Sequence, residues 1–373
     1  MLINTIDNFI KLRLLLDVEG IGSGKLFNLL SKFNSIEEIT NTNYQSLISI
    51  EGISNNLANR ILKKLDNFKS FEKQIIVELE KLHKLDAKWI TYWSKEYPQN
   101  LKNIFAPPII LYYKGEIKNS DSNSVAVVGT RMASRYGKSI AEKFTKDLAK
   151  NNITIVSGLA RGIDSVAHKS SLDAGGRTLA IIGSGLDVIY PAENKNLFLE
   201  ICNNGAVISE YILGTKPDAQ NFPKRNRIIS GISLGTLVIE TKVSGGALQT
   251  AAFALDQNKE VFAVPGNLGI PQSEGTNLLI QKGEAKLVRN AEDILVELNL
   301  KIQPEIGKNI PEPTIDLNMF EQKIYELLSD QPKHIDIISK ESGINSSECL
   351  VHLLSLEFRN IVKQLAGKNF VRS

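Results

Sequence analysis

Cysteine and histidine are scarce in this sequence, and their scarcity limits the chemistry that it can carry. Its 373 residues include two distant cysteines, Cys202 and Cys349, and four scattered histidines. The absence of a CxxC pair argues against a disulfide framework or a cysteine zinc site, and it fits a reducing cytoplasm. A histidine-based metal or acid–base site is not expected either, so we predict no metal and no cofactor.

Long hydrophobic runs and a large excess of one charge are also lacking. The apolar pattern near the N-terminus is broken by Asp7, Lys11 and Arg13, and no run approaches the length of a membrane span. We therefore expect no signal peptide and no membrane partner. The formal net charge is only +3, so any nucleic-acid site must depend on local clusters of cations.

Short β-branched runs, each ending in a glycine-containing tip, recur through the middle of the chain. They occupy 125–131, 153–158, 179–185, 237–246 and 261–266. Most are followed by a helical pattern, and such alternation predicts a parallel sheet that is covered by helices on both faces. The carboxyl ends of parallel strands meet at one edge, where ligands bind. Several glycine tips along that edge can hold a row of phosphates.

Composition and periodicity divide the chain into five parts. These are a helical domain (1–82), a bridging segment (83–123), a parallel-sheet domain (124–300), a linker (301–316) and a terminal module (317–373). The bridge contains an expected edge strand at 110–115. Prolines mark the linker, and helices followed by a hairpin predict a winged-helix-like module at the end.

A degenerate repeat lies within the helical domain. The sequence VEGIG at 18–22 recurs 32 residues later as IEGIS at 50–54, and each copy precedes an apolar helical stretch. The pattern resembles tandem helix–hairpin–helix (SAM-like) units, whose turn amides can face a DNA phosphate at a helix start. The alternative, a small helical domain that only packs, stays open at this point.

The first two glycine tips favour phosphate binding. Gly129, Thr130 and Arg131 end the first run, and Ala133-Ser134 is expected to open a helix that reaches about Lys150. A helix start offers free amides, and arginine adds a two-pronged phosphate donor. The second tip is expected to expose amides of Ser157 and Gly158 beside Arg161. Asp164, just beyond, either caps the following helix, which we favour, or acts as an acid.

Two common nucleotide sites are absent from these tips. No GxGxxG motif follows the first strand, and the second strand lacks the acidic residue that binds a ribose. Gly137-Lys138-Ser139 imitates the end of a P-loop, but Met132 stands where that motif needs a glycine. These three residues also fall inside an expected helix, so NAD and P-loop functions are both excluded.

A cluster of cations beside an aromatic residue lies at 221–227, NFPKRNR, which precedes an expected apolar helix. Lys224, Arg225 and Arg227 suit a phosphate backbone, and Phe222 offers a stacking surface to any base. This combination favours single-stranded nucleic acid. The alternative is an ordinary basic loop with Phe222 turned inward.

Six motifs in order resemble the DNA-processing protein A family, DprA, also called Smf. They are GTR (129–131), SGLARGID (157–164), GLDVIYP (185–191), FPKRNRIISGIS (222–233), FAVPG (262–266) and SEGTNLLIQKGEA (273–285). The resemblance implies an extended Rossmann fold that binds single-stranded DNA and forms a homodimer through this domain. It also implies that the protein loads the recombinase RecA onto incoming single strands in natural transformation.

The resemblance also assigns roles to individual residues. Arg131 matches a phosphate-binding arginine, and Phe222 matches an aromatic residue near the bases. The other matched positions are Ser157 and Gly158 in the second phosphate loop, Arg225 and Arg227 in the RNR motif, and Gly245, Gly246 and Thr250 in a later loop. The serine that the family has in that later loop is a glycine here, with Ser244 one position early. We therefore expect the loop to act through its backbone amides.

An enzyme is the competing hypothesis. Gly235, Thr236 and Glu240 weakly echo the PGGxGTxxE loop of Rossmann proteins that hydrolyse nucleotide N-glycosidic bonds. The preceding Pro-Gly-Gly is missing, and no second carboxylate is placed to act as the paired acid or base. We predict that the protein is not an enzyme. The terminal module is not expected to read a major groove, because 344–357 contain no lysine or arginine.

Overall fold

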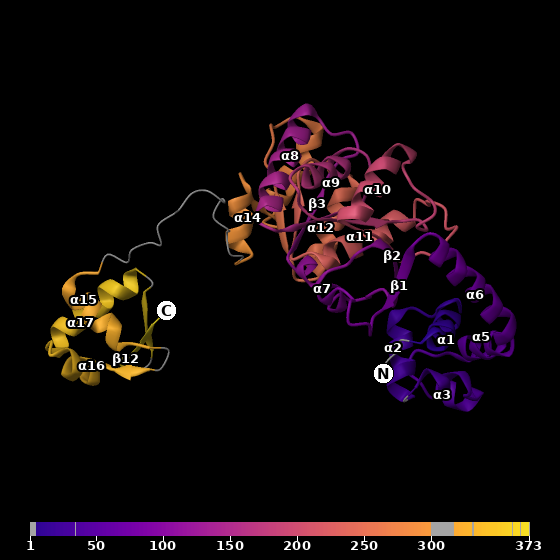
Figure 1. The fold of residues 1–373 in the computed structure, drawn as a ribbon, viewed down its shortest axis with the longest axis horizontal. Helices are drawn as coiled ribbons and strands as arrows, with labels where there is room; N and C mark the ends of the chain where they lie inside the picture. The colour runs from indigo at the N-terminus through magenta and orange to yellow at the C-terminus, as the bar shows by residue number, and fades with distance from the viewer. Residues whose placement is uncertain are drawn as a thin grey trace. The chain divides into compact units, whose positions relative to one another are not determined.

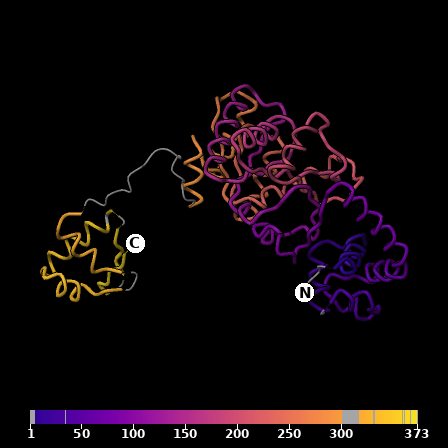
Figure 2. Tube along the Cα trace, viewed as in Figure 1, coloured from indigo at the N-terminus to yellow at the C-terminus, as the bar shows by residue number. Residues whose placement is uncertain are grey.

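A computed structural model describes residues 5–33, 35–299, 317–329, 332–359, 361–365 and 367–372. The chain divides into two compact units, Met1–Gln303 and Pro304–Ser373, which Figures 1 and 2 colour along the chain from indigo to yellow. The first unit holds the N-terminal helices and the large sheet. The expected linker, 301–316, lies outside the described residues.

The N-terminal helices form the predicted pair of hairpins. They are α1 (Ile6–Leu16), α2 (Ser23–Lys32), α3 (Ile36–Thr40), α4 (Tyr44–Ile48), α5 (Asn55–Asp66) and α6 (Phe68–Lys84). Gly20 and Gly52 occupy equivalent turns, with φ of +98° and +82°. Glycine tolerates this left-handed region without steric cost, which explains why both copies of the repeat keep it.

Reciprocal hydrogen bonds join the two copies of the repeat. The Asn28 side chain on α2 donates to the Glu51 carbonyl of the second turn, at 3.2 Å. Arg60 on α5 donates to the Glu19 carbonyl of the first turn, at 3.0 Å. Both the donors and the acceptors are 32 positions apart. The sequence repeat is therefore also a structural repeat, in which each second helix holds the turn of the other copy.

A nine-stranded sheet follows, in the order β1-β2-β6-β5-β4-β3-β7-β8-β9. The strands are β1 (Ala87–Thr91), β2 (Ile110–Gly115), β3 (Ser124–Val128), β4 (Thr154–Ser157), β5 (Thr178–Ile182), β6 (Gly205–Ser209), β7 (Gly235–Val238), β8 (Glu260–Ala263) and β9 (Lys286–Leu287). In this spatial order, each strand from β6 to β9 runs parallel to the next one. Strand β2 is antiparallel to both β1 and β6. The predicted parallel sheet is confirmed.

The expectation of an edge strand at 110–115 is wrong. Strand β2 is internal, because β1 pairs along its outer side from Ala87 opposite Lys114 to Thr91 opposite Ile110. Trp89 of β1 stacks on Phe9 of α1, with 4.1 Å between ring centroids. This contact joins the helical domain to the outer strand of the sheet.

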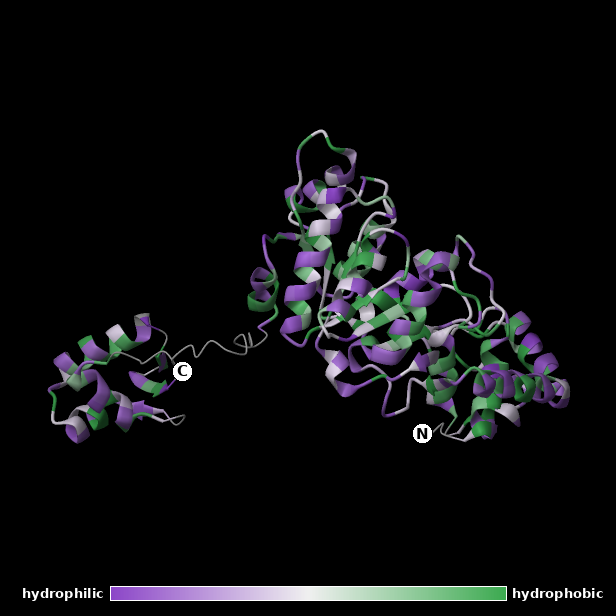
Figure 3. Ribbon diagram, turned by 45° about the horizontal axis from the view of Figure 1, so that its top comes forward, coloured by the Kyte–Doolittle hydropathy of each residue, from purple (hydrophilic) through white to green (hydrophobic). Residues whose placement is uncertain are grey.

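Helices cover both faces of the sheet. They are α7 (Gln99–Lys102), α8 (Arg135–Lys150), α9 (Ile163–Asp173), α10 (Lys195–Asn204), α11 (Asn221–Ile232), α12 (Gly246–Asp256), α13 (Pro271–Gln281) and α14 (Ala291–Glu297). Alternate residues of β3 face opposite sides: Val127 packs in the cluster of α8 and α9, and Ala126 in that of α11 and α12. The central strands are accordingly green in the hydropathy view of Figure 3.

The start of α8 agrees with the sequence prediction. Ser134 caps the helix, and its hydroxyl accepts the amide of Gly137 at 3.0 Å. Lys138 lies in the first turn and is exposed. Residues 137–139, which resemble the end of a P-loop in sequence, therefore lie in a helix, as expected.

The second unit has the predicted winged-helix order of helices and hairpin. Its elements are α15 (Met319–Leu327), β10 (Lys333–His334), α16 (Ile335–Ser342), α17 (Ser346–Phe358), β11 (Val362–Leu365) and β12 (Asn369–Arg372). The three strands form an antiparallel sheet in the order β10-β12-β11. Leu353 and Leu356 of α17 are fully buried, whereas Val351 and Leu354 on the same helix are exposed.

Candidate nucleic-acid interface

A cavity of about 750 Å³ opens at the carboxyl ends of the parallel strands. We call it the crest pocket. Its lining comes from the loops after β3 (129–132), β4, β5, β6 and β7 (241–245), and from the first turns of α11 and α12. The glycine tips after β3 and β7 therefore meet at one edge, as the sequence predicts, whereas the predicted tip at 261–266 is not part of the lining.

The loop after β3 presents a cation to an aromatic ring. The amide of Thr130 donates to the Glu240 carbonyl at 2.7 Å, which ties this loop to the segment after β7. The Arg131 side chain is exposed, and its Cζ lies 5.3 Å from the centroid of the Phe222 ring. Tyr190 lies against the same ring, with 5.8 Å between centroids. A guanidinium is attracted electrostatically to the face of an aromatic ring. Two neighbouring rings also offer a stacking surface to a base.

The basic cluster at 221–227 is helical, whereas we expected the helix to follow it. Asn221–Ile232 form α11, with Pro223 in the first turn, where proline costs no hydrogen bond. Helical spacing then separates the cluster, because residues three and four apart share a face. Phe222 and Arg225 accordingly line the crest pocket, together with Asn226 and Ile229.

Lys224 and Arg227 do not line the crest pocket. Lys224 is exposed on the outside of α11. The guanidinium of Arg227 forms two hydrogen bonds of 2.6 Å to the Glu210 carboxylate and another of 2.6 Å to the Ala106 carbonyl. This arginine connects α11 to two loops, which is a structural role.

Arg225 is buried at the floor of the crest pocket, with 4% of its surface exposed. Its Nε and Nη1 have no hydrogen-bond partner among the described residues. Burial lowers the pKa of Arg225 to about 10, while the nearby Asp164 carboxylate opposes that shift. Both nitrogens are closed to solvent, so Arg225 gives the floor of the pocket a buried positive charge that attracts an anion without a direct hydrogen bond.

Asp164 binds the loop that precedes its helix. Its carboxylate accepts the amide of Gly158 at 3.1 Å and also that of Ala160. Asp164 therefore does not cap α9, contrary to the interpretation that we favoured. Gly162 occupies the N-cap position of that helix. Burial raises the pKa of Asp164, and the charge of Arg225 opposes the rise. Asp164 thus positions the loop and balances the charge of Arg225.

The second tip does not expose its amides, contrary to expectation. Ser157 is fully buried, and its hydroxyl donates to the Val127 carbonyl at 2.7 Å. The amide of Gly158 is used by Asp164. Arg161 is exposed but pairs with Glu193 through two hydrogen bonds of 2.5 and 2.7 Å. Asp164 within the motif, together with Val127 and Glu193 far from it in the sequence, therefore uses up the donors of this loop.

The start of α12 supplies the free backbone donors that the second tip lacks. Gly245 is its N-cap, and within the described chain no side chain caps it. Gly246 is exposed, with open space where a Cβ would stand, and Thr250 lines the pocket one turn further on. Unpaired amides at a helix start bind phosphate and other anions.

Sequence reasoning missed several residues that line this pocket, among them Met132, Tyr190, Asn226 and Lys242. Lys242 is exposed on the loop after β7. Its position just after a predicted strand could have indicated that it belongs to the site. Asn226 was recognisable only once 221–227 was read as a helix, since it lies four positions after Phe222.

Glu240 is a structural carboxylate. It is 3% exposed and accepts the amide and the hydroxyl of Ser134 at 2.9 and 2.5 Å. It therefore fixes the start of α8 against β7. Across the described ranges, no cluster of histidine, cysteine, aspartate and glutamate is suited to hold a metal ion.

Three family models match the chain. Residues 88–299 match DNA recombination-mediator protein A, 12–67 match a SAM-like helix-hairpin-helix tandem, and 310–368 match the DprA winged helix domain. The first covers more than half of the sequence. The other two support the helical and winged-helix interpretations of the two ends.

Individual proteins are similar over most of the chain. Protein Smf from Synechocystis is 32% identical over 389 residues, covering 95% of this chain and 96% of that protein. The X-ray structure of DprA from Streptococcus pneumoniae has a TM-score of 0.65 at 35% identity, over 77% of this chain and 97% of the other. DprA from Helicobacter pylori, described for its single-stranded DNA binding mode, has a TM-score of 0.52 at 31% identity, over 57% and 96%. By sequence and by fold, the chain belongs to the DprA/Smf family of DNA recombination-mediator proteins.

Proposed function

We propose that this protein is a recombination mediator that binds single-stranded DNA in the crest pocket. The observation that carries the proposal is the joint placement of Arg131, Phe222 and Tyr190 beside the open start of α12. The rings stack on bases, while Arg131 and the amides at Gly246 contact phosphates. Stacking does not depend on the base, so the pocket accepts strands of any sequence.

The buried floor of the pocket adds to this site. Arg225 adds a buried positive charge beneath the pocket, and Lys242 adds an exposed cation at the rim of the loop after β7. Lys224 lies outside the pocket lining and contributes only local positive charge. Arg161 is also outside the lining, and Glu193 balances its charge. In the proposed site Ser157, Gly158 and Arg227 act by shaping the crest.

We further propose that the protein delivers the bound strand to RecA in natural transformation. The family description as a recombination mediator and the H. pylori work on single-stranded DNA support this role. The protein would act in the cytoplasm as a homodimer joined through the sheet domain. Every helix in the described part of the chain is too short or too polar to cross a bilayer.

The chemistry of the crest favours binding over catalysis. An N-glycosidic hydrolase needs a paired acid and base near the sugar. Glu240 is buried against Ser134, and Asp164 is buried against Arg225 and two amides. We propose that the protein is not an enzyme. Release of free base from nucleoside monophosphates would contradict this.

Binding of oligothymidylates of increasing length, followed by fluorescence anisotropy over a salt series, tests the function. We expect affinity to rise with length up to a site of several nucleotides, about 4–16 by analogy with other single-strand binders. We also expect it to fall with salt as phosphates displace counterions. Affinity for mononucleotides alone, with no gain from length, would sink the proposal.

A further inference from the structure

The outer edge of the nine-stranded sheet borders a cavity of about 630 Å³. We call it the edge groove. It is lined by consecutive residues of β1, 87–90, by the last turns of α6 and by Ile6 of α1. Consecutive residues of a strand point to opposite faces of its sheet. A cavity that touches both sets therefore reaches around the free edge of β1, where a further strand would lie.

The backbone groups of β1 alternate between its partner strand and the edge groove. The amide of Tyr92 donates to the Ile109 carbonyl at 2.9 Å. In an antiparallel pair every second residue forms the hydrogen bonds with the partner strand, so Lys88 and Ile90 also bond to β2. The amides and carbonyls of the odd-numbered residues of β1 point to the outer edge instead.

Two of the odd-numbered residues keep open backbone groups. A turn uses the groups of Thr91, since its amide donates to the Ser94 hydroxyl at 3.0 Å and its carbonyl accepts the Ser94 amide at 2.8 Å. Ala87 and Trp89 have no partner on the outer side within the described chain, because β1 ends the strand order. An amide and a carbonyl from each of these two residues are therefore open to an extended chain that pairs with the edge.

The wall of the edge groove beside Trp89 is apolar and partly exposed. Trp89 is half-buried, and Leu79 of α6 and Ile6 of α1 line the groove with it. Ile6 is 60% exposed. A strand that pairs with Ala87 and Trp89 would point the side chains opposite them toward this wall. Apolar side chains at those positions would cover it.

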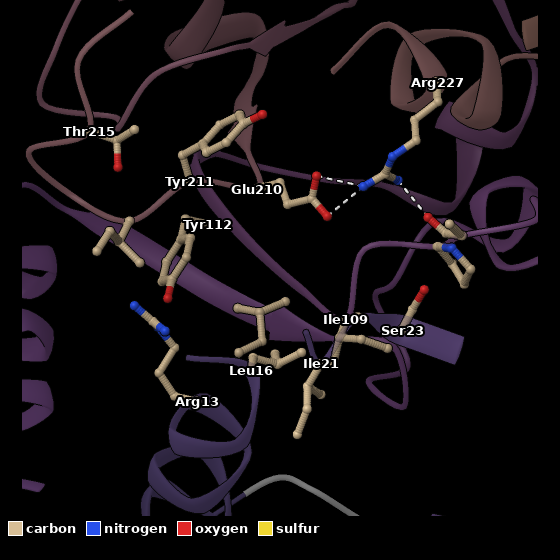
Figure 4. A pocket seen from close by; sticks show the side chains of 15 residues that line it. Arg13, Leu16, Ile21, Ser23, Ile109, Tyr112, Glu210, Tyr211, Thr215 and Arg227 are labelled. Carbon is tan, nitrogen blue, oxygen red and sulfur yellow. Dashed lines mark hydrogen bonds and ion pairs between the residues drawn. The ribbon is translucent and has the colours of Figure 1, made fainter. Parts of the chain in front are cut away.

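The helices that form this wall are fixed to the sheet from the inner side. The Tyr112 hydroxyl of β2 faces the Arg13 guanidinium of α1 at the wall of another cavity, of about 440 Å³ (Figure 4). Glu78 of α6 interacts with both groups. The edge groove is therefore already formed, so its wall needs no ordering when a partner binds.

Lys88 determines the charge that suits a partner strand. It is exposed, and its ammonium group has no ion-pair partner among the described residues. It lies between Ala87 and Trp89, so one residue of the partner strand stands directly opposite it. If a second copy of this chain paired with the same two residues, each Lys88 would stand opposite the other. Like charges directly opposite each other destabilise a sheet, whereas a carboxylate opposite Lys88 stabilises it.

The surroundings of Lys88 also favour an acidic segment. Residues 81–88 contain three lysines and one aspartate. Glu96 lines the edge groove as well, and its charge acts on Tyr113 of the inner strand β2. The edge strand itself presents a lysine, and the end of the preceding helix adds further cations.

We propose that the edge groove binds an extended segment of a partner protein, which adds a strand beside β1. The segment places an acidic residue opposite Lys88 and an apolar residue on each side of it, toward the Trp89 wall. Main-chain hydrogen bonds to Ala87 and Trp89 provide affinity, and the alternating side chains provide specificity. This inference does not depend on the proposed function of the crest, since the linings of the edge groove and the crest pocket share no residue.

Three synthetic peptides of about six residues, the length of a typical strand, test the proposal. The first has a central valine, aspartate and valine, flanked by serine and threonine. The second carries lysine in place of the aspartate. The third is the first peptide with both valine amides methylated, which removes the hydrogen bonds of a strand and keeps every side chain. Binding of each labelled peptide to the full chain is followed by fluorescence anisotropy.

We expect the aspartate peptide to bind saturably, about threefold or more tightly than the lysine peptide. The methylated peptide should bind about tenfold or more weakly than its parent. Binding should also slow hydrogen exchange at the amides of Ala87 and Trp89. The proposal is overturned by equal binding of the methylated peptide, or by no saturable binding of the aspartate peptide up to about 1 mM.

Lys88→Glu tests the position of the acidic residue. We expect it to weaken the aspartate peptide by about tenfold and to strengthen the lysine peptide, while Lys88→Gln gives a smaller loss of the aspartate peptide. Thermal unfolding checks that both variants keep the fold. Lys84→Glu is the matched control, because Lys84 is exposed on α6 and does not line the edge groove.

Two results of these measurements would contradict the assignment. Equal weakening in Lys84→Glu and Lys88→Glu would show that only net charge matters. Displacement of the aspartate peptide by oligothymidylate would show that the edge groove takes nucleic acid and not a protein strand.

Discussion

The guanidinium of Arg131 lies over the ring of Phe222, with Cζ 5.3 Å from the ring centroid. Arg131 comes from the loop after β3, and Phe222 comes from the first turn of α11. The fold therefore joins the cation that we propose for a phosphate and the ring that we propose for a base into one unit. Each residue also orients the other, so their contributions to binding are not independent.

We predict that Arg131→Ala and Phe222→Ala weaken single-stranded DNA binding in different ways. Loss of Arg131 removes one phosphate contact, so the slope of log affinity against log salt becomes shallower by about 0.7. Loss of Phe222 removes about 1–3 kcal/mol of stacking and leaves the slope nearly unchanged. Fluorescence anisotropy across a salt series measures both quantities.

The double variant measures the coupling between the two residues. We expect the two losses to differ from additivity by about 0.5–1 kcal/mol, which is typical of an exposed cation–π pair. Arg135→Ala is a matched control, because Arg135 is an exposed arginine on α8 that does not line the crest pocket. A slope change as large in the control as in Arg131→Ala would contradict the assignment.

The sheet and its glycine edge could be predicted because their signal is local. Unbroken β-branched runs define β3, β4 and β5, and Ser134 marks the start of α8. The face of α11 that lines the pocket could not be predicted, because Pro223 made 221–227 resemble a loop. Proline is tolerated in the first turn of a helix, and helical spacing then decides which cations reach the pocket.

The fate of individual donors depends on contacts that are distant in sequence. The hydroxyl of Ser157 is occupied by the Val127 carbonyl, and the guanidinium of Arg227 is occupied by Glu210. A motif shows that such groups are present, but only the packed structure shows which of them already have partners. The strand β6 was also missed, since its apolar core of three residues is too short to stand out.

We predict that Arg227 supports the fold and does not bind phosphate. Arg227→Met should lower the free energy of unfolding by about 1–3 kcal/mol, because charge-assisted hydrogen bonds to Glu210 and Ala106 are lost. The salt slope of DNA binding should stay as in the wild type. Glu210→Gln discriminates further: if Arg227 were a phosphate ligand, removing its competing carboxylate would raise DNA affinity, and we expect no rise.

Gly158 is predicted to be intolerant of any side chain. A Cβ at this position would stand 1.8 Å from Nη1 of Arg225, so Gly158→Ala must displace the buried guanidinium. We expect a loss of about 1–3 kcal/mol in stability, together with weaker DNA binding. Gly246→Ala is the control, since a Cβ there meets open space. Urea unfolding of the two variants gives the comparison, and equal stability would contradict the packing argument.

Removal of the winged-helix-like unit should leave single-strand binding largely intact. Helix α17 has no lysine or arginine and exposes Val351 and Leu354, which suits a protein contact better than a groove of DNA. A chain that ends at residue 316 should bind oligothymidylate within a few-fold of the full chain. A loss of about tenfold or more, equivalent to about 1.4 kcal/mol, would show that this unit contributes to the site.

His168 is predicted to make the first unit sensitive to acid. It is fully buried, and its Nδ1 lies 2.6 Å from the Thr178 hydroxyl, which itself donates to the Ile155 carbonyl at 2.8 Å. Because that hydroxyl proton is already used, Nδ1 must carry the proton that His168 donates. Nε2 is then the basic nitrogen, and in the described structure it has no partner. Burial, aided by the charge of Arg225, lowers the pKa of His168 to about 3.

The direction of the pH dependence follows from this lowered pKa. The unfolded chain binds a proton at His168 below about pH 6.5, whereas the folded chain does not until about pH 3. The stability is therefore complete above pH 6.5 and falls with acid, by up to about 1.4 kcal/mol per pH unit, or about 2 kcal/mol at pH 5. His168→Gln keeps a hydrogen-bonding side chain without the titration, so urea unfolding between pH 7 and 5 should show a shallower decline in the variant. Equal declines in the two proteins would mean that other groups carry the acid sensitivity.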